Sequence, residues 1–140
     1  MFFIAPLQWY VDAAVQLAGS GGGFVYVASD GAMDAEPLRA GGLDVIDSAA
    51  LIESVCSDAR WLASGAADPP DPVAVDFVAM QAAQALLISN STFSFAAALL
   101  NPDCRLFLRP DRTSGGLRPF DPWHSEVLLG LAGEAIRFAG

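Results

Sequence analysis

A polar turn in the middle of the chain combines residue types that bind phosphate groups. The apolar residues 86–88 run directly into Ser89, Asn90, Ser91 and Thr92, after which an apolar helix is predicted to begin. The first turn of a helix has backbone N–H groups without partners and carries partial positive charge, so it stabilises an anion. The alternative interpretation is helix capping, because serine, threonine and asparagine are the preferred N-cap residues.

The basic residues provide a second candidate for anion binding. All seven are arginine, against sixteen acidic residues, and the formal net charge is −9. Nucleic acid is not an expected partner of so acidic a chain, because its binding depends on neutralising phosphates. A small anion can still be bound locally, since screening limits the reach of surface charge to about 8 Å. Four arginines lie in a stretch whose one acidic residue is Asp111: Arg105, Arg109, Arg112 and Arg118.

The sequence has few residues that could form a zinc site or a histidine-based catalytic triad. Cys56 and Cys104 form no CxxC pair, and His124 is the only histidine. Two reduced thiols are therefore expected, rather than a zinc site or a histidine-based triad. The sequence has no run of the roughly 20 apolar residues that a membrane helix needs, and residues 1–10 lack the basic start and small-residue cleavage site of a secretory signal. We expect a cytoplasmic protein without a metal or cofactor of its own.

Helices and short apolar strands alternate along the chain, as is typical of α/β proteins. The length fits one domain, residues 1–140, and the expected fold is a Rossmann-like parallel sheet with helices on both faces. Because ligands bind where the carboxyl ends of parallel strands meet, Asp30, the 89–91 turn and Arg109 are expected to share one edge. Helices are predicted at 6–18, 32–40, 49–56, 73–85, 92–100 and 125–138, strands at 24–28, 43–46, 86–88 and 105–108, and a loop at 109–123.

The string DFVAMQAAQALLISNSTFSFAAALLN, residues 76–101, resembles a motif of glycosyltransferase family 11, the bacterial α-1,2-fucosyltransferases and their relatives. The family pattern has an aspartate and a methionine ahead of a short helix, then an apolar strand and an SNSTFS-like turn that opens an aromatic helix. Residues 24–30 and 6–14 resemble the family's earlier strand and helix. Where the family often has two tryptophans after the last serine, this chain has Phe95 and Ala96.

The resemblance implies the C-terminal, donor-binding half of a GT-B-type enzyme that transfers fucose from GDP-fucose to a glycan acceptor. Asp76 matches an acidic position associated with guanine, and Asp30 is a candidate for a second nucleotide contact. The alternatives are a solvated helix residue for Asp76 and an ordinary turn residue for Asp30. Arg109 or Arg112 would supply charge to the phosphates, unless both are solvated loop arginines. The positions that match the diphosphate-binding turn are Ser89, Asn90, Ser91, Thr92 and Phe93.

The chain also departs from the family. The HxRxGD motif, whose arginine pairs with the donor phosphate in this family, does not occur, and no residue is a clear catalytic base. The N-terminal acceptor-binding half is missing as well. We therefore expect either a fragment of a longer protein or a degenerate relative. The alternatives are a non-catalytic α/β relic or scaffold, and a binding module for another phosphorylated ligand.

Overall fold

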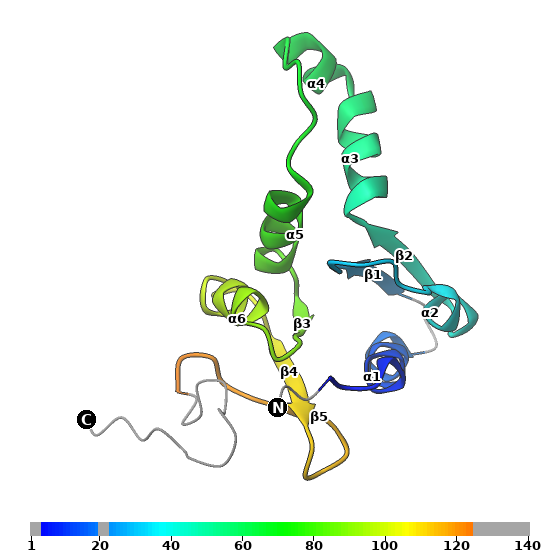
Figure 1. Cartoon of the computed structure of the whole chain (residues 1–140), viewed down its shortest axis with the longest axis vertical. Coiled ribbons are helices and arrows are strands. Elements are labelled where there is room, and N and C mark those ends of the chain that lie inside the picture. Colours follow the sequence, from blue (N-terminus) through cyan, green and yellow to red (C-terminus); the bar gives the residue numbers. More distant parts are fainter. Residues whose placement is uncertain (1–3, 20–22, 125–140) are drawn as a thin grey trace. The chain divides into compact units, whose positions relative to one another are not determined.

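The computed structural model describes residues 4–19 and 23–124. Within these ranges the chain is a mixed α/β protein with six helices and two small sheets (Figure 1). It divides into two compact units. One consists of residues 11–79, and the other of residues 80–124 together with residues 4–10. We call them the 11–79 unit and the 80–124 unit.

A parallel pair of strands forms the sheet of the 11–79 unit. Strand β1 pairs with β2 in parallel, with Val25 opposite Val45, and α2 lies in the connection between the two strands. The apolar core beside this sheet contains the buried residues Val11, Leu38 and Leu43, which come from α1, α2 and β2. The elements up to the end of this unit are α1 (Leu7–Ala18), β1 (Gly23–Val27), α2 (Glu36–Ala40), β2 (Leu43–Asp47), α3 (Ser48–Ser57), α4 (Ala59–Ser64) and α5 (Pro72–Gln81).

Local sequence explains where several of these elements begin and end. Gly42 follows α2 with a φ of +83°, a backbone conformation that favours glycine. The Asp47 carboxylate accepts a hydrogen bond from the backbone N–H of Ala50 at 2.9 Å, and so caps α3. Asp58 caps α4 in the same way, accepting from the N–H of Arg60 at 2.7 Å. Aspartate is a preferred residue at this position because its carboxylate satisfies an otherwise unpaired helical donor.

The 80–124 unit has a three-stranded sheet with strand order β3-β4-β5. β3 pairs with β4 in parallel, whereas β5 pairs with β4 in the antiparallel sense. Phe95 of α6 stacks on Phe120 at 6.2 Å between ring centroids, and Phe107 of β4 meets Phe120 edge-on at 5.9 Å. These three rings join α6 to the sheet. The elements are β3 (Ala85–Leu87), α6 (Thr92–Leu99), β4 (Leu106–Asp111) and β5 (Gly116–Pro119).

Asn101 connects the end of α6 to the segment that precedes β3. Its side chain is fully buried, and its Nδ2 donates to the backbone carbonyls of Met80 and Ala83, each at 2.9 Å. Because the donors of Asn101 satisfy both carbonyls, this side chain fixes how the chain enters β3.

The expected single Rossmann-like sheet is not evident in the residues that the structure describes. The strands form two separate sheets, and residues 109–123 are not the predicted loop. β4 instead continues to Asp111 and the chain returns as β5, through a turn in which Gly115 has a φ of +71°. This hairpin occupies the edge of β4 that a further parallel strand would need. The predicted helix at 125–138 lies outside the described residues.

Candidate functional site

The turn between β3 and α6 is held together by its serines. The Ser91 hydroxyl accepts a hydrogen bond from the backbone N–H of Ser94 at 3.1 Å, so Ser91 is the N-cap of α6. Ser94 is buried, and its hydroxyl lies 3.0 Å from the Ser91 hydroxyl and 3.4 Å from the Ser89 carbonyl oxygen. The capping interpretation of Ser91 is therefore confirmed. Sequence analysis did not single out Ser94, which closes the turn.

The opening of α6 has the electrostatic character that an anion requires. No acidic residue lies in the first turn of the helix, so no carboxylate there opposes a bound phosphate. The side chains of Thr92 and Phe93 in this turn are exposed, while Asn90 is half-buried. The helix dipole alone stabilises an anion at such a position by about 0.3–1 kcal/mol.

Strand pairing brings the start of this turn alongside Arg109. The backbone N–H of Ile88 donates to the Leu108 carbonyl at 2.9 Å, which extends the β3–β4 ladder by one residue toward Ser89. Arg109 is the next residue of β4. It lies within the strand rather than after it, because β4 runs on to Asp111, so its predicted position in a loop is wrong.

Aromatic packing holds the Arg109 guanidinium in place. Its Cζ lies 5.4 Å from the centroid of the Phe120 ring, in a cation–π contact. Since Phe120 also stacks on Phe95, one ring connects Arg109 with the first half of α6. Burial lowers the pKa of Arg109, and the nearby Arg118 guanidinium lowers it further. Arg109 still remains charged at neutral pH, because free arginine titrates above pH 12.

Asp76 has a different environment from either one considered in the sequence. It lies in α5 with only 9% of its surface exposed, so the alternative of a solvated helix residue is wrong. The hydroxyl of Tyr26 in β1 donates to its Oδ1 at 2.7 Å. Burial, followed by this hydrogen bond to a carboxylate, raises the pKa of Tyr26. Tyr26 and Asp76 therefore form a carboxylate–phenol pair, for which the apolar run 24–28 gave no signal.

Asp30 lies in an exposed bend after β1. In that bend the Ser29 hydroxyl donates to the Gly31 carbonyl at 2.8 Å. Asp30 and Asp76 belong to the 11–79 unit, whereas the turn at 89–93 and Arg109 belong to the 80–124 unit. Of the predicted site residues, the structure therefore brings together the turn and Arg109.

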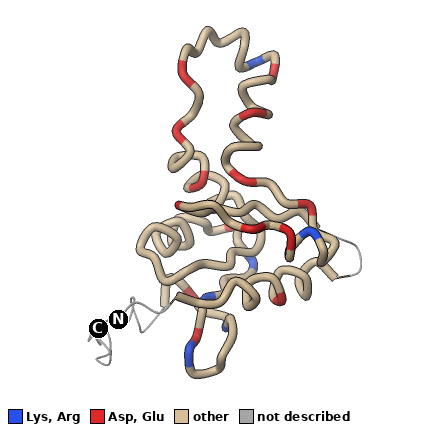
Figure 2. Tube along the Cα trace, turned by 45° about the vertical axis from the view of Figure 1, so that its right-hand side comes forward, with Lys and Arg blue, Asp and Glu red and all other residues tan. Residues whose placement is uncertain are grey.

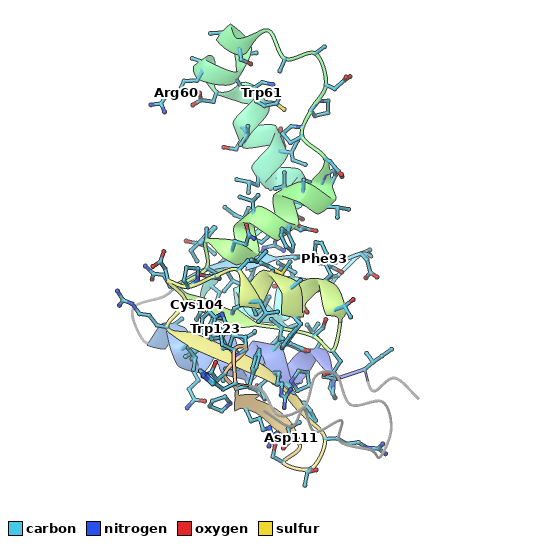
Figure 3. The ribbon with its side chains drawn as sticks, turned by 90° about the vertical axis from the view of Figure 1, so that its left-hand side faces the viewer. Arg60, Trp61, Phe93, Cys104, Asp111 and Trp123 are labelled. Carbon is cyan, nitrogen blue, oxygen red and sulfur yellow. The ribbon has the colours of Figure 1, made fainter. Side chains whose placement is uncertain are left out.

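A shallow groove of about 300 Å³ lies beside the start of β4 in the 80–124 unit. Its walls include Phe107, Phe120 and Trp123, and Trp123 is 49% exposed. Figure 3 labels Trp123. The Trp123 indole N–H donates to the Leu99 carbonyl at 3.1 Å, which fixes the ring. Burial raises the pKa of the Cys104 thiol at the edge of the groove, so this thiol is protonated at neutral pH and is a poor nucleophile.

Charge is divided unequally between the two units. Of the sixteen acidic residues, eleven lie in the 11–79 unit, together with Arg39 and Arg60. Residues 80–124 contain three aspartates and four arginines, and Figure 2 marks both kinds of charge along the chain. An anionic ligand is therefore repelled less by the 80–124 unit.

The part of the chain that the structure describes contains neither a cluster of metal-ligating side chains nor a helix that could span a membrane. Residues 4–19 and 23–124 contain no group of three His, Cys, Asp or Glu side chains arranged to hold a metal ion. No helix within them has the length and apolar character needed to cross a bilayer.

His124 Nδ1 lies 2.9 Å from Asp121 Oδ2, and this hydrogen bond lowers the pKa of the exposed Asp121 carboxyl.

Comparison of the chain with protein-family models, with curated proteins and with solved structures found no match.

Proposed function

We propose that this chain is the donor-nucleotide-binding part of a fucosyltransferase-like glycosyltransferase. It binds GDP-fucose with the diphosphate at the opening of α6, and a glycan hydroxyl is the acceptor. Two things support this proposal. One is the resemblance of residues 76–101 to the family 11 motif, and the other is the geometry around that motif.

The observation that carries the proposal is the position of the 89–93 turn beside Arg109. The turn follows β3, and the Ile88–Leu108 hydrogen bond aligns its start with Arg109 on β4. Fucosyl transfer leaves negative charge on the departing diphosphate. Fixed helical N–H groups and a guanidinium stabilise that charge without moving, which is the usual way enzymes assist such a leaving group.

The Rossmann-like sheet of a GT-B donor half belongs to the same proposal. It is supported by two parallel β-α-β segments, β1-α2-β2 and β3-α6-β4. The resemblance also assigns a guanine contact to Asp76 and a second nucleotide contact to Asp30, both of which belong to the 11–79 unit. An acceptor-binding half and a base for the acceptor hydroxyl would come from outside these residues.

A second candidate function is a structural α/β module without a ligand. The serine network favours it, because the Ser91 hydroxyl already caps α6 and Ser94 closes the turn. In this alternative the SNSTFS sequence serves the fold alone, and Arg109 serves the packing on Phe120.

Thermal unfolding with nucleotides distinguishes the two candidates. For the donor-binding function, GDP and GDP-fucose raise the melting temperature more than UDP at equal millimolar concentration. A ligand at 100 times its dissociation constant adds about 2.7 kcal/mol to the free energy of unfolding. The double variant Ser91→Ala, Thr92→Ala should lose most of the GDP-dependent shift. A melting temperature that no nucleotide changes would favour the structural module.

A further inference from the structure

Two arginines stand directly opposite each other on the β4–β5 hairpin. Arg109 of β4 is paired in register with Arg118 of β5, so both side chains project from the same face of the sheet. Like charges at directly opposed positions of an antiparallel pair destabilise it. The adjacent pairs, Leu108 opposite Pro119 and Pro110 opposite Leu117, are apolar and project from the other face of the sheet. The hairpin therefore concentrates positive charge at one point.

Among the residues that the structure describes, the Asp111 carboxylate lies beside Arg118 of this pair. Asp111 Oδ2 lies 3.9 Å from Nη1 of Arg118, at the long end of the range for an ion pair. The carboxylate also accepts hydrogen bonds from the backbone N–H groups of Thr113 and Ser114, each at 3.2 Å. Asp111 therefore bonds mainly to backbone N–H groups of the turn. Figure 3 shows Asp111 at the end of the hairpin. It brings one negative charge to the two positive charges of the arginine pair.

The arginine pair is also held in position before any ligand arrives. Arg109 rests on the Phe120 ring, which α6 and β4 support through Phe95 and Phe107. Arg118 lies on β5 and has about half of its side-chain surface exposed. An anion that reaches the pair therefore meets one fixed and one accessible guanidinium.

We propose that Arg109 and Arg118 form a clamp for a diphosphate group. A planar guanidinium forms two parallel hydrogen bonds to phosphate oxygens, and two such groups match the two phosphates of a diphosphate. A small anion fits better than a polyanion, because the net charge of −9 repels a long chain of phosphates. That the diphosphate belongs to a nucleotide rests on the proposed function. Arg118 is then a binding residue of that site.

Calorimetric titration with inorganic pyrophosphate and with GDP tests the clamp. Arg118→Gln should weaken the binding of both ligands about tenfold, as expected for losing hydrogen bonds between charged groups. Asp111→Asn should tighten both about threefold, because it removes the competing carboxylate. Arg60→Gln, which removes the same charge from an exposed position in α4, is the matched control and should change neither. Circular dichroism melts establish that each variant is folded.

The outcomes separate the clamp from the proposed function. Failure of pyrophosphate to bind, or binding that is unchanged in folded Arg118→Gln and Asp111→Asn, would overturn the clamp. GDP binding that exceeds UDP binding and is indifferent to Arg118 would overturn the clamp and leave the proposed function standing. Arg118-dependent binding of pyrophosphate, GDP and UDP with equal affinity would support the clamp and count against a guanine-specific donor site.

Discussion

The phenol of Tyr26 donates a hydrogen bond to the Asp76 carboxylate at 2.7 Å, joining β1 to α5 across 50 residues of sequence. Asp76 is almost completely buried, and the Tyr26 hydroxyl supplies a hydrogen-bond donor to its Oδ1. The pair accounts for an aspartate within an otherwise apolar helix segment.

Replacing Tyr26 by phenylalanine should destabilise the protein by about 1–3 kcal/mol, since a buried carboxylate oxygen loses its donor. Urea unfolding measures this loss. Tyr10→Phe is the matched control, because the Tyr10 hydroxyl donates to the Ile88 carbonyl over 3.4 Å and its loss should cost less. Equal free energies of unfolding for Tyr26→Phe and the unmodified chain would show that the pair adds nothing to stability.

Tyrosine ionisation should be coupled to unfolding at high pH. Burial raises the pKa of Tyr10 to about 12, and burial with the Asp76 hydrogen bond raises the pKa of Tyr26. The unfolded chain ionises its tyrosines near pH 10, so stability is complete below about pH 10 and falls as the pH rises toward about 12. A pH titration followed by the near-ultraviolet absorbance of tyrosinate measures the ionisation of the chain's two tyrosines. The titration is run with and without denaturant to compare the unfolded and folded chain. Identical titration curves in the two conditions would contradict it.

Asn101→Ala should cost about 2–4 kcal/mol of stability. The substitution removes the Asn101 donor from the carbonyls of Met80 and Ala83 and opens a cavity at a fully buried position, although the Met80 carbonyl keeps the Ala83 N–H at 3.3 Å. Asn101→Asp should be no better tolerated, because it keeps the shape but replaces the donor with a buried charge. Chemical denaturation provides the measurement. A loss below about 0.5 kcal/mol for both variants would mean that Asn101 does not hold the segment before β3.

The cap of α6 can be separated from any ligand-binding role by choosing the substitution at residue 91. Ser91→Ala removes the acceptor for the Ser94 N–H and should cost about 1 kcal/mol. Ser91→Asp keeps a capping acceptor and favours the helix dipole, so its free energy of unfolding should stay near that of the unmodified chain. If Ser91→Asp destabilises as much as Ser91→Ala in a denaturation experiment, the cap seen at 3.1 Å is not what stabilises the turn.

Local features of the chain were largely predictable from sequence. The N-cap at Ser91 follows from the polar turn between an apolar strand and an apolar helix, and α6 begins at the predicted residue, Thr92. The strands β1 to β4 were expected as short apolar runs and are found there. Each of these features depends on interactions between residues near in sequence, such as capping and burial of a contiguous run.

The pairings between distant residues were not predictable. Residues 109–123 contain proline, glycine and arginine, which are typical of loops, yet the pairing of β4 with β5 makes a hairpin of them. Arg118 therefore could not be placed opposite Arg109, and Tyr26 could not be matched to Asp76. These contacts depend on strand register and on helix packing, about which one sequence without alignment carries no direct signal.

Calorimetric titration of GDP into the unmodified chain and into Ser91→Ala and Ser91→Asp tests most directly whether the opening of α6 binds a diphosphate. The proposed function predicts saturable binding of GDP to the unmodified chain and weaker binding to Ser91→Ala. It predicts no binding to Ser91→Asp, because the new carboxylate repels the phosphates while still capping the helix. No heat of binding at millimolar GDP, or equal affinities for all three proteins, would contradict it.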